Sequence, residues 1–94
     1  MLIIAGTLTV APSDRDAYLD AVKHVSVLAR AARGCHAFMQ SADPIEPGVI
    51  NIYERWSSDE TLREFRTSGG PKLETPPVIS ASVARYIIAG VEKA

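Results

Sequence analysis

Apolar residues occur in both alternating sets of positions from Leu2 to Val10, a stretch rich in Leu, Ile, Thr and Val. This composition predicts a β-strand. Further along, apolar residues recur at spacings of four and three, which is the period of an amphipathic helix. This apolar stripe consists of Tyr18, Val22, Val25, Ala29 and Ala32. We therefore expect a strand followed by a long helix.

Signals for the two ends of this helix flank the stripe. Pro12 interrupts the strand, and Ser13 with Asp16 resembles a capping box in which Asp replaces the usual Glu. Gly34 is placed to be the residue that ends the helix, because glycine adopts the left-handed conformation common just after a helix. The helix is thus expected to begin near Ser13 and to end near Gly34.

Two more strands and a second helix follow in the pattern. Cys35 to Ser41 predicts the second strand, Asp43 to Gly48 a turn, and Val49 to Trp56 the third strand. Ser57 and Glu60 have the spacing of a capping box, which predicts that the second helix begins at Ser57.

The second helix is short, with Leu62 and Phe65 directed inward, and Gly69-Gly70-Pro71 ends it. Thr67 to Ser80 contains two glycines and three prolines and has no clear periodicity. We expect this segment to be the mobile lid of a pocket. Ala84 to Val91 predicts the last strand.

The order β-α-β-β-α-β predicts one α+β domain over residues 1–94 with the ferredoxin-like arrangement, in which both helices cover one face of a four-stranded antiparallel sheet. The first and last strands are apolar on both sides, whereas a sheet with one wet face alternates between apolar and polar residues. A second copy of the chain is the simplest cover for the open face. We therefore expect a homodimer joined through that face.

The net charge of −1 and the pI near 6.1 argue against nucleic acid or an anionic membrane as a partner. No apolar run approaches the ~20 residues that span a bilayer, and the first residues lack the basic region of a signal peptide. The single Cys35 cannot form an internal disulfide, which suits a reducing cytoplasm. The two histidines, His24 and His36, are not accompanied by a metal-binding motif, so we expect no metal site.

The segment "IYERWSSDETLREF", together with "MLIIAGTLTVAP" and Gly34-Cys35, resembles the antibiotic biosynthesis monooxygenase family over almost the whole chain. The resemblance implies a dimeric α+β barrel. It also implies an oxygenase that uses no flavin, haem or metal cofactor and acts with O₂ on a small aromatic phenol or quinol. The haem-degrading branch is disfavoured, because Gly6-Thr7 replaces an asparagine on the first strand and a histidine after the second helix is missing.

The resemblance implies that Trp56 lines the pocket and donates a hydrogen bond, whereas the alternative is a core aromatic beside the second helix. As a pocket wall, Trp56 would be partly packed and would face a tyrosine hydroxyl or His36. Asn51 is the amide candidate, but its five-residue spacing from Trp56 places the two side chains on opposite faces unless a β-bulge intervenes. Without a bulge, Asn51 is expected at the subunit interface.

His36, on the same face of its strand as Phe38 and Gln40, is the candidate general base, because its ordinary pKa of ~6.5 is near working pH. The candidates for substrate contacts share aromatic rings near the expected pocket: they are Tyr53, Phe38, Phe65 and Tyr86. Two alternatives remain open. One is a non-catalytic barrel that binds a small ligand or a protein, and the other is an isomerase on the same scaffold.

Overall fold

The structure is a computed structural model that describes residues 1–69 and 73–94. Its elements are β1 (Leu2–Val10), a 3₁₀ turn η1 (Pro12–Asp14), α1 (Arg15–Ala31), β2 (Cys35–Ala42), β3 (Val49–Trp56), α2 (Asp59–Arg66) and β4 (Val78–Ile87). This order confirms the predicted β-α-β-β-α-β succession. In the described ranges, no helix combines the length and the apolar character needed to cross a bilayer.

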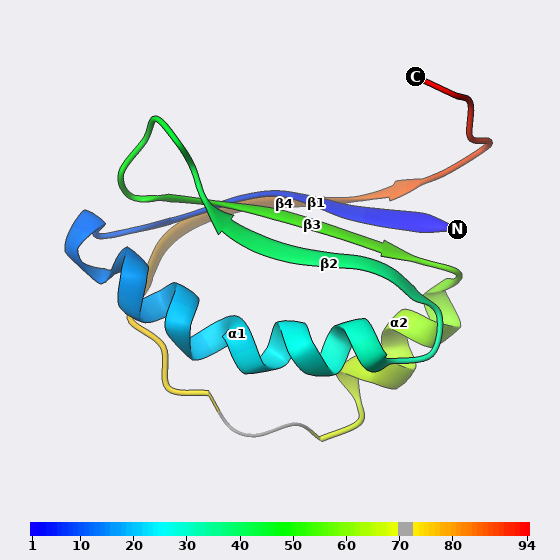
Figure 1. The fold of residues 1–94 in the computed structure, drawn as a ribbon, viewed down its shortest axis with the longest axis horizontal. Helices are drawn as coiled ribbons and strands as arrows, with labels where there is room; N and C mark the ends of the chain where they lie inside the picture. Colours follow the sequence, from blue (N-terminus) through cyan, green and yellow to red (C-terminus); the bar gives the residue numbers. More distant parts are fainter. Residues whose placement is uncertain (70–72) are drawn as a thin grey trace.

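The four strands form one sheet in the order β2-β3-β1-β4, and every neighbouring pair is antiparallel. Figure 1 shows α1 and α2 together on one side of this sheet, with the other side left open. The ferredoxin-like α+β prediction is therefore confirmed. β1 occupies an inner position, where it pairs with β3 on one edge and with β4 on the other.

The hydrophobic core lies between the helices and the helix-facing side of the sheet. One cluster contains Leu2, Ile4, Ala29, Phe38, Trp56 and Leu62, and the other contains Val10, Tyr18, Val22 and Ile50. The predicted stripe on α1 is confirmed, because its residues are either buried or packed against these clusters. Burial of each large apolar side chain stabilises the fold by roughly 1.5–3 kcal/mol, which fixes α1 against the sheet.

The ends of α1 differ from the prediction. Ser13 and Asp16 form no capping box, since η1 precedes the helix and Asp14 occupies the N-cap position without a side-chain cap bond. The helix ends at Ala31, where the extended backbone of Ala32 breaks it, and not at Gly34. Gly34 has φ +80°, and a Cβ there would lie 2.5–2.6 Å from the Thr61 side chain. Glycine is therefore needed for the close approach of α2.

The cap of α2 is Ser58, one residue later than predicted. The Ser58 hydroxyl accepts a hydrogen bond from the backbone N–H of Thr61 at 3.2 Å. Ser57 still belongs to the end of the sheet, because its N–H donates to the carbonyl oxygen of Gly34 at 2.8 Å. The inward positions of Leu62 and Phe65 are confirmed, since Leu62 is buried and Phe65 packs against the first cluster.

β4 begins at Val78 and ends at Ile87, so the predicted limits Ala84 and Val91 were both wrong. Pairing with β1 sets the observed limits, because Val78 lies opposite Val10 and Ile87 lies opposite Leu2. Val78 to Ser80 therefore belong to a strand and not to the expected lid. Residues 70–72 of that lid lie outside the described residues, and residues 73–77 have no regular structure. Its mobility stays a prediction.

Candidate functional site

Three aromatic rings from three different elements meet at the α2 end of the core. Trp56 is the last residue of β3 and is 0% exposed. Its ring lies 5.4 Å, centroid to centroid, from that of Phe65 on α2. Phe65 in turn contacts Phe38 of β2 edge to face, at 6.2 Å and 67°. These distances are typical of stabilising aromatic pairs, so the rings form a rigid apolar centre.

The indole N–H of Trp56 donates a hydrogen bond to Oε1 of Glu54 at 3.0 Å. The two residues are two positions apart on β3, so both point to the helix-facing side of the sheet. Trp56 is fully packed and its polar partner is a carboxylate. The expectation that it is partly packed and faces a tyrosine hydroxyl or His36 was therefore wrong.

Glu54 is a half-buried carboxylate whose neighbours across the sheet are apolar. In the sheet it lies between Ile4 of β1 and Phe38 of β2, both of which belong to the core. Burial raises the pKa of the Glu54 carboxyl, whereas the hydrogen bond from Trp56 and the charge of Arg66 act in the lowering direction. Glu54 was not among the residues predicted from the sequence. The available signal was its position on the same side of β3 as Ile50, Ile52 and Trp56.

A cavity of about 670 Å³ lies between the end of α1 and α2, next to the aromatic centre. Its apolar lining consists of Val25, Leu28, Ala32 and Phe65, and its polar lining includes Arg33, Glu64 and Arg66. A cavity of this size and composition is typical of a small-molecule site. Phe65 both lines the cavity and packs on Trp56, so it connects the cavity wall to the Trp56–Glu54 pair.

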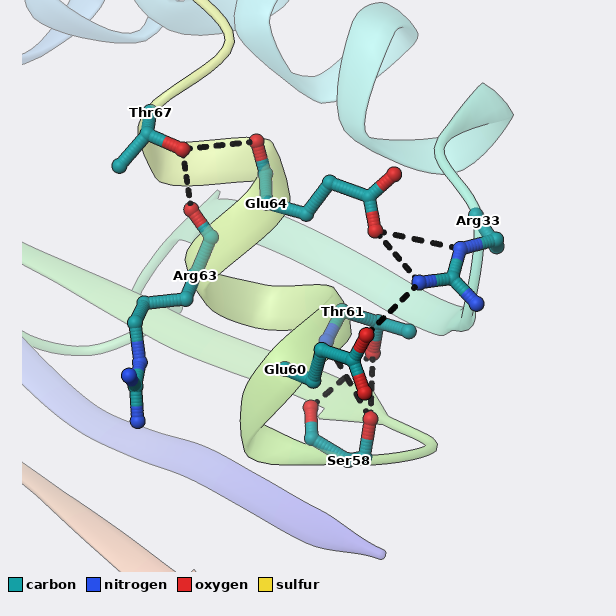
Figure 2. A network of polar contacts seen from close by, with 7 residues as sticks. All are labelled: Arg33, Ser58, Glu60, Thr61, Arg63, Glu64 and Thr67. Carbon is teal, nitrogen blue, oxygen red and sulfur yellow. Dashed lines mark hydrogen bonds and ion pairs between the residues drawn. The ribbon is translucent and has the colours of Figure 1, made fainter.

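An ion-pair network joins the end of α1 to α2 at the edge of this cavity (Figure 2). Nε and Nη2 of Arg33 donate to Glu64 Oε2 at 3.1 and 2.6 Å, and Nη2 lies 3.6 Å from Glu60 Oε1. These side chains are exposed, so the network contributes little stability. It does hold a guanidinium at the rim of the cavity, where it can attract an anionic oxygen.

His36 lies at the exposed start of β2 and does not line the cavity beside the aromatic centre. Its Nε2 is 2.8 Å from the Ser57 hydroxyl, and the residue lines a separate hollow of about 330 Å³. The pairing of β2 with β3 shifts between Cys35 and Ala37, which places His36 at an irregularity in the strand. The structure therefore does not bring this candidate base to Trp56.

Asn51, Tyr53 and Tyr86 lie on the open side of the sheet. β3 pairs with β1 without a register shift, so the odd-numbered residues of β3 face away from Trp56. The Asn51 amide donates to Oδ1 of Asp43 at 2.9 Å, which ties it to the β2–β3 turn. Of the seven candidate residues, Trp56, Phe38 and Phe65 come together and the other four do not.

The fold and this helix–sheet site define a ferredoxin-like α+β protein with an aromatic centre beside a cavity. Residues 1–72 match the family model described as antibiotic biosynthesis monooxygenase, so the chain belongs to that family. A comparison with curated proteins gives no match.

Three solved structures share the fold. A proposed antibiotic biosynthesis monooxygenase from Deinococcus radiodurans has a TM-score of 0.80 at 18% identity, covering 100% of this chain and 98% of that one. Rv0793 from Mycobacterium tuberculosis gives 0.69 at 21% identity, with 99% and 97% covered. The heme-degrader MhuD from the same organism, solved with two hemes in its active site, gives 0.70 at 12% identity, with 99% and 100% covered.

These identities show the fold alone. The family match adds a general kind of protein, since the family is named for monooxygenases and one of the similar structures carries the same name. The chain is therefore of the general monooxygenase-like kind. MhuD, which shares the fold, is described as a heme-degrader, so the fold alone does not determine the chemistry.

Proposed function

We propose that the chain is a cofactor-independent monooxygenase that oxidises a small phenol or quinol with O₂ in the cavity between α1 and α2. The observation that carries the proposal is the apolar cavity of about 670 Å³, whose wall residue Phe65 packs directly on Trp56. A flat aromatic substrate suits such a cavity, because aromatic rings stack on one another and displace water from apolar walls.

The chemistry needs few protein groups. Removal of the phenolic proton leaves the electron pair on the oxygen, and the resulting phenolate can give an electron to O₂. One oxygen atom is then inserted into the substrate, and the other leaves as water with two hydrogens taken from the substrate. The protein supplies a dry pocket and positive charge near the phenolate, for which Arg33 and Arg66 on the cavity lining are suited.

The second part of the proposal is a homodimer in which a copy of the chain covers the open sheet face. Neighbouring open-face positions on the four strands form an apolar row: Met39, Tyr53, Ala5 and Ala84. Met39 is 46% exposed in the single chain. Burying such a row against its own copy supports a dimer, because the interface would gain the hydrophobic stabilisation that the helices give to the other side.

Uptake of O₂ by purified, metal-free protein across a panel of quinols and anthrones tests the proposed reaction. We expect uptake with at least one substrate and one oxidised product molecule per O₂. Leu28→Trp, which fills the cavity from its lining, is expected to raise KM or abolish turnover. The matched control is Val27→Trp, since Val27 is the adjacent residue of α1, 60% exposed and outside this cavity.

The contrary outcomes are distinct. Ligand binding without O₂ uptake favours the non-catalytic barrel, and conversion of the substrate without O₂ uptake favours an isomerase. Equal loss of turnover in Leu28→Trp and Val27→Trp would show that the cavity is not the site.

A further inference from the structure

We infer that Glu54 is the general base of this site and takes the phenolic proton of the substrate, while Trp56 holds its carboxylate in place. The inference deepens the proposed function and rests on it. The O–H bond of the phenol breaks, a new O–H bond forms on Glu54, and the electron pair stays on the phenolate oxygen. The proton on Glu54 is then available to the reduced oxygen in the later step that forms water.

Glu54 lies on the side of β3 that faces the core. The helix-facing side of β3 consists of Ile50, Ile52, Glu54 and Trp56, and the neighbours of Glu54 across the sheet are Ile4 and Phe38. A carboxylate in such surroundings loses hydration without gaining a matched ion pair, so it lowers the stability of the fold. A group that costs stability beside a cavity is a candidate for chemistry.

Only one of the two carboxylate oxygens of Glu54 accepts a hydrogen bond from the described residues. Trp56 donates to Oε1 at 3.0 Å, and within residues 1–69 and 73–94 no hydrogen bond reaches Oε2. An indole N–H donates but neither accepts nor releases a proton at working pH. Trp56 therefore acts as a positioning residue, and Oε2 is the oxygen that is free to receive a proton.

Burial and nearby charges act on the carboxylate of Glu54. Burial raises the pKa of Glu54 toward working pH, which makes its carboxylate a stronger base than an exposed one. The groups around it are the Cys35 thiol on β2 and Arg66 on α2, with Arg30 of α1 acting on that thiol. Across the sheet on β4, Arg85 is paired with Asp59 and is therefore already neutralised.

The route from the cavity to Glu54 passes two consecutive residues of α2. Phe65 lines the cavity and packs on Trp56, and Arg66 lines the cavity while its charge acts on Glu54. Phe65 is half-buried, and the role of Glu54 requires its ring to rotate so that a substrate in the cavity can reach the carboxylate. Cys35 does not compete as a base, because burial raises the pKa of its thiol and its Sγ lies 3.6 Å from the Ala37 carbonyl oxygen, to which it donates.

The test compares Glu54→Gln with Glu46→Gln, which makes the same change on the exposed turn between β2 and β3, outside the cavity lining. We expect kcat of Glu54→Gln to fall by about 100-fold or more, the range for loss of a general base, with little change in KM. The acidic limb of the pH profile of kcat should disappear with it. Glu54→Asp, which keeps a carboxyl group, should retain that limb, and Glu46→Gln should behave as the wild type does.

Two readouts do not depend on turnover. Trp56 is the only tryptophan, so its fluorescence should titrate with Glu54 in the wild type and lose that transition in Glu54→Gln. Bound 4-nitrophenol should ionise more fully on the wild type than on Glu54→Gln, as measured by the absorbance of its anion.

The outcomes separate this inference from the proposed function. Wild-type O₂ uptake with unchanged kcat and pH profile in Glu54→Gln overturns the role of Glu54 and leaves the monooxygenase standing. A wild type that neither consumes O₂ nor binds 4-nitrophenol overturns the proposed function, and the role of Glu54 falls with it.

Discussion

The two faces of the sheet are made by the same four strands, yet helices cover only one of them. On the helix-facing side, Ile50 and Trp56 are 0% exposed because α1 and α2 cover them. On the open side, Met39 is 46% and Tyr86 is 55% exposed. One face is thus covered by the helices of the chain itself, whereas the other presents large apolar side chains to solvent, which is the basis of the proposed dimer.

The open side also has an internal order. Its rows across β2, β3, β1 and β4 are Ala37–Arg55–Ile3–Tyr86, Met39–Tyr53–Ala5–Ala84 and Ser41–Asn51–Thr7–Ser82. The first two rows are mostly apolar and the third is polar throughout. This gradient favours contact through one half of the face and a hydrated rim at the other, which is the usual anatomy of an interface.

Truncation of a large apolar side chain to alanine should lower the free energy of unfolding by very different amounts on the two faces. Ile50→Ala is expected to lower the free energy of unfolding by about 2–5 kcal/mol, because a fully buried side chain leaves a cavity. Met39→Ala on the open side should cost roughly 0.5 kcal/mol or less at concentrations where the chain is monomeric. Urea unfolding of both variants measures the difference, and equal costs would break the comparison.

A charge on the open face should separate the proposed dimer. Ala84→Lys places like charges in the apolar row of both copies, so we expect the dissociation constant to rise by about 100-fold or more. Val83→Lys is the control, since Val83 is the neighbouring residue on the helix-facing side of β4. Sedimentation at micromolar concentration measures both. A wild type that is monomeric there refutes the dimer.

Trp56→Phe tests whether the covered face has a role beyond packing. The loss of contacts should cost about 1–3 kcal/mol, because Trp56 is fully buried. Turnover per folded molecule should also fall, since the phenyl ring cannot donate the hydrogen bond that holds Glu54. Melting temperature and rate are measured on one preparation. A destabilised variant with normal turnover would rule out the catalytic reading of Trp56.

Ser58→Ala tests how much the N-cap of α2 contributes to the stability of the covered face. Loss of the cap that accepts from Thr61 should cost about 1 kcal/mol. Ser57→Ala is the matched control, because the Ser57 hydroxyl contacts His36 and caps no helix. Thermal unfolding of both variants distinguishes them, and an equal shift would argue that neither serine caps α2.

Glu54→Gln is expected to change stability least, and in a direction set by pH. Burial raises the folded-state pKa of Glu54 above its unfolded value, so the carboxylate destabilises the fold above that folded-state pKa. Below the unfolded-state pKa the group is protonated in both states and the penalty is absent. The variant should therefore melt slightly higher than the wild type at neutral pH and equally at acidic pH. A lower melting point at neutral pH contradicts this sign.

Elements with a strong period were predictable from the sequence. The stripe on α1 and the limits of β3 were correct, because each is set by residues within the element. The limits of β4 were not, since they depend on which residues of β1 lie opposite. The α2 cap moved from Ser57 to Ser58 because a backbone bond to Gly34 keeps Ser57 in the sheet.

The candidate site was predicted in part for the same reason. Trp56, Phe38 and Phe65 were chosen as large aromatics, and packing brings such residues together. His36 was misplaced because the register shift at the start of β2 is a tertiary feature that leaves no sequence period. Glu54 was missed although the parity of β3 could have revealed it, since a charged residue there stands among apolar ones.

The inner position of β1 has a consequence for folding during synthesis. Among the elements of the described residues, β1 comes first, whereas its partners β3 and β4 follow later and β4 comes after both helices. During synthesis one edge of β1 has no partner until β4 has left the ribosome. Pairings between residues so distant in sequence form slowly, and an unpaired apolar strand invites association between nascent chains. A premature stop before β4 would leave that edge of β1 without a partner, which makes such fragments targets for chaperones and proteases.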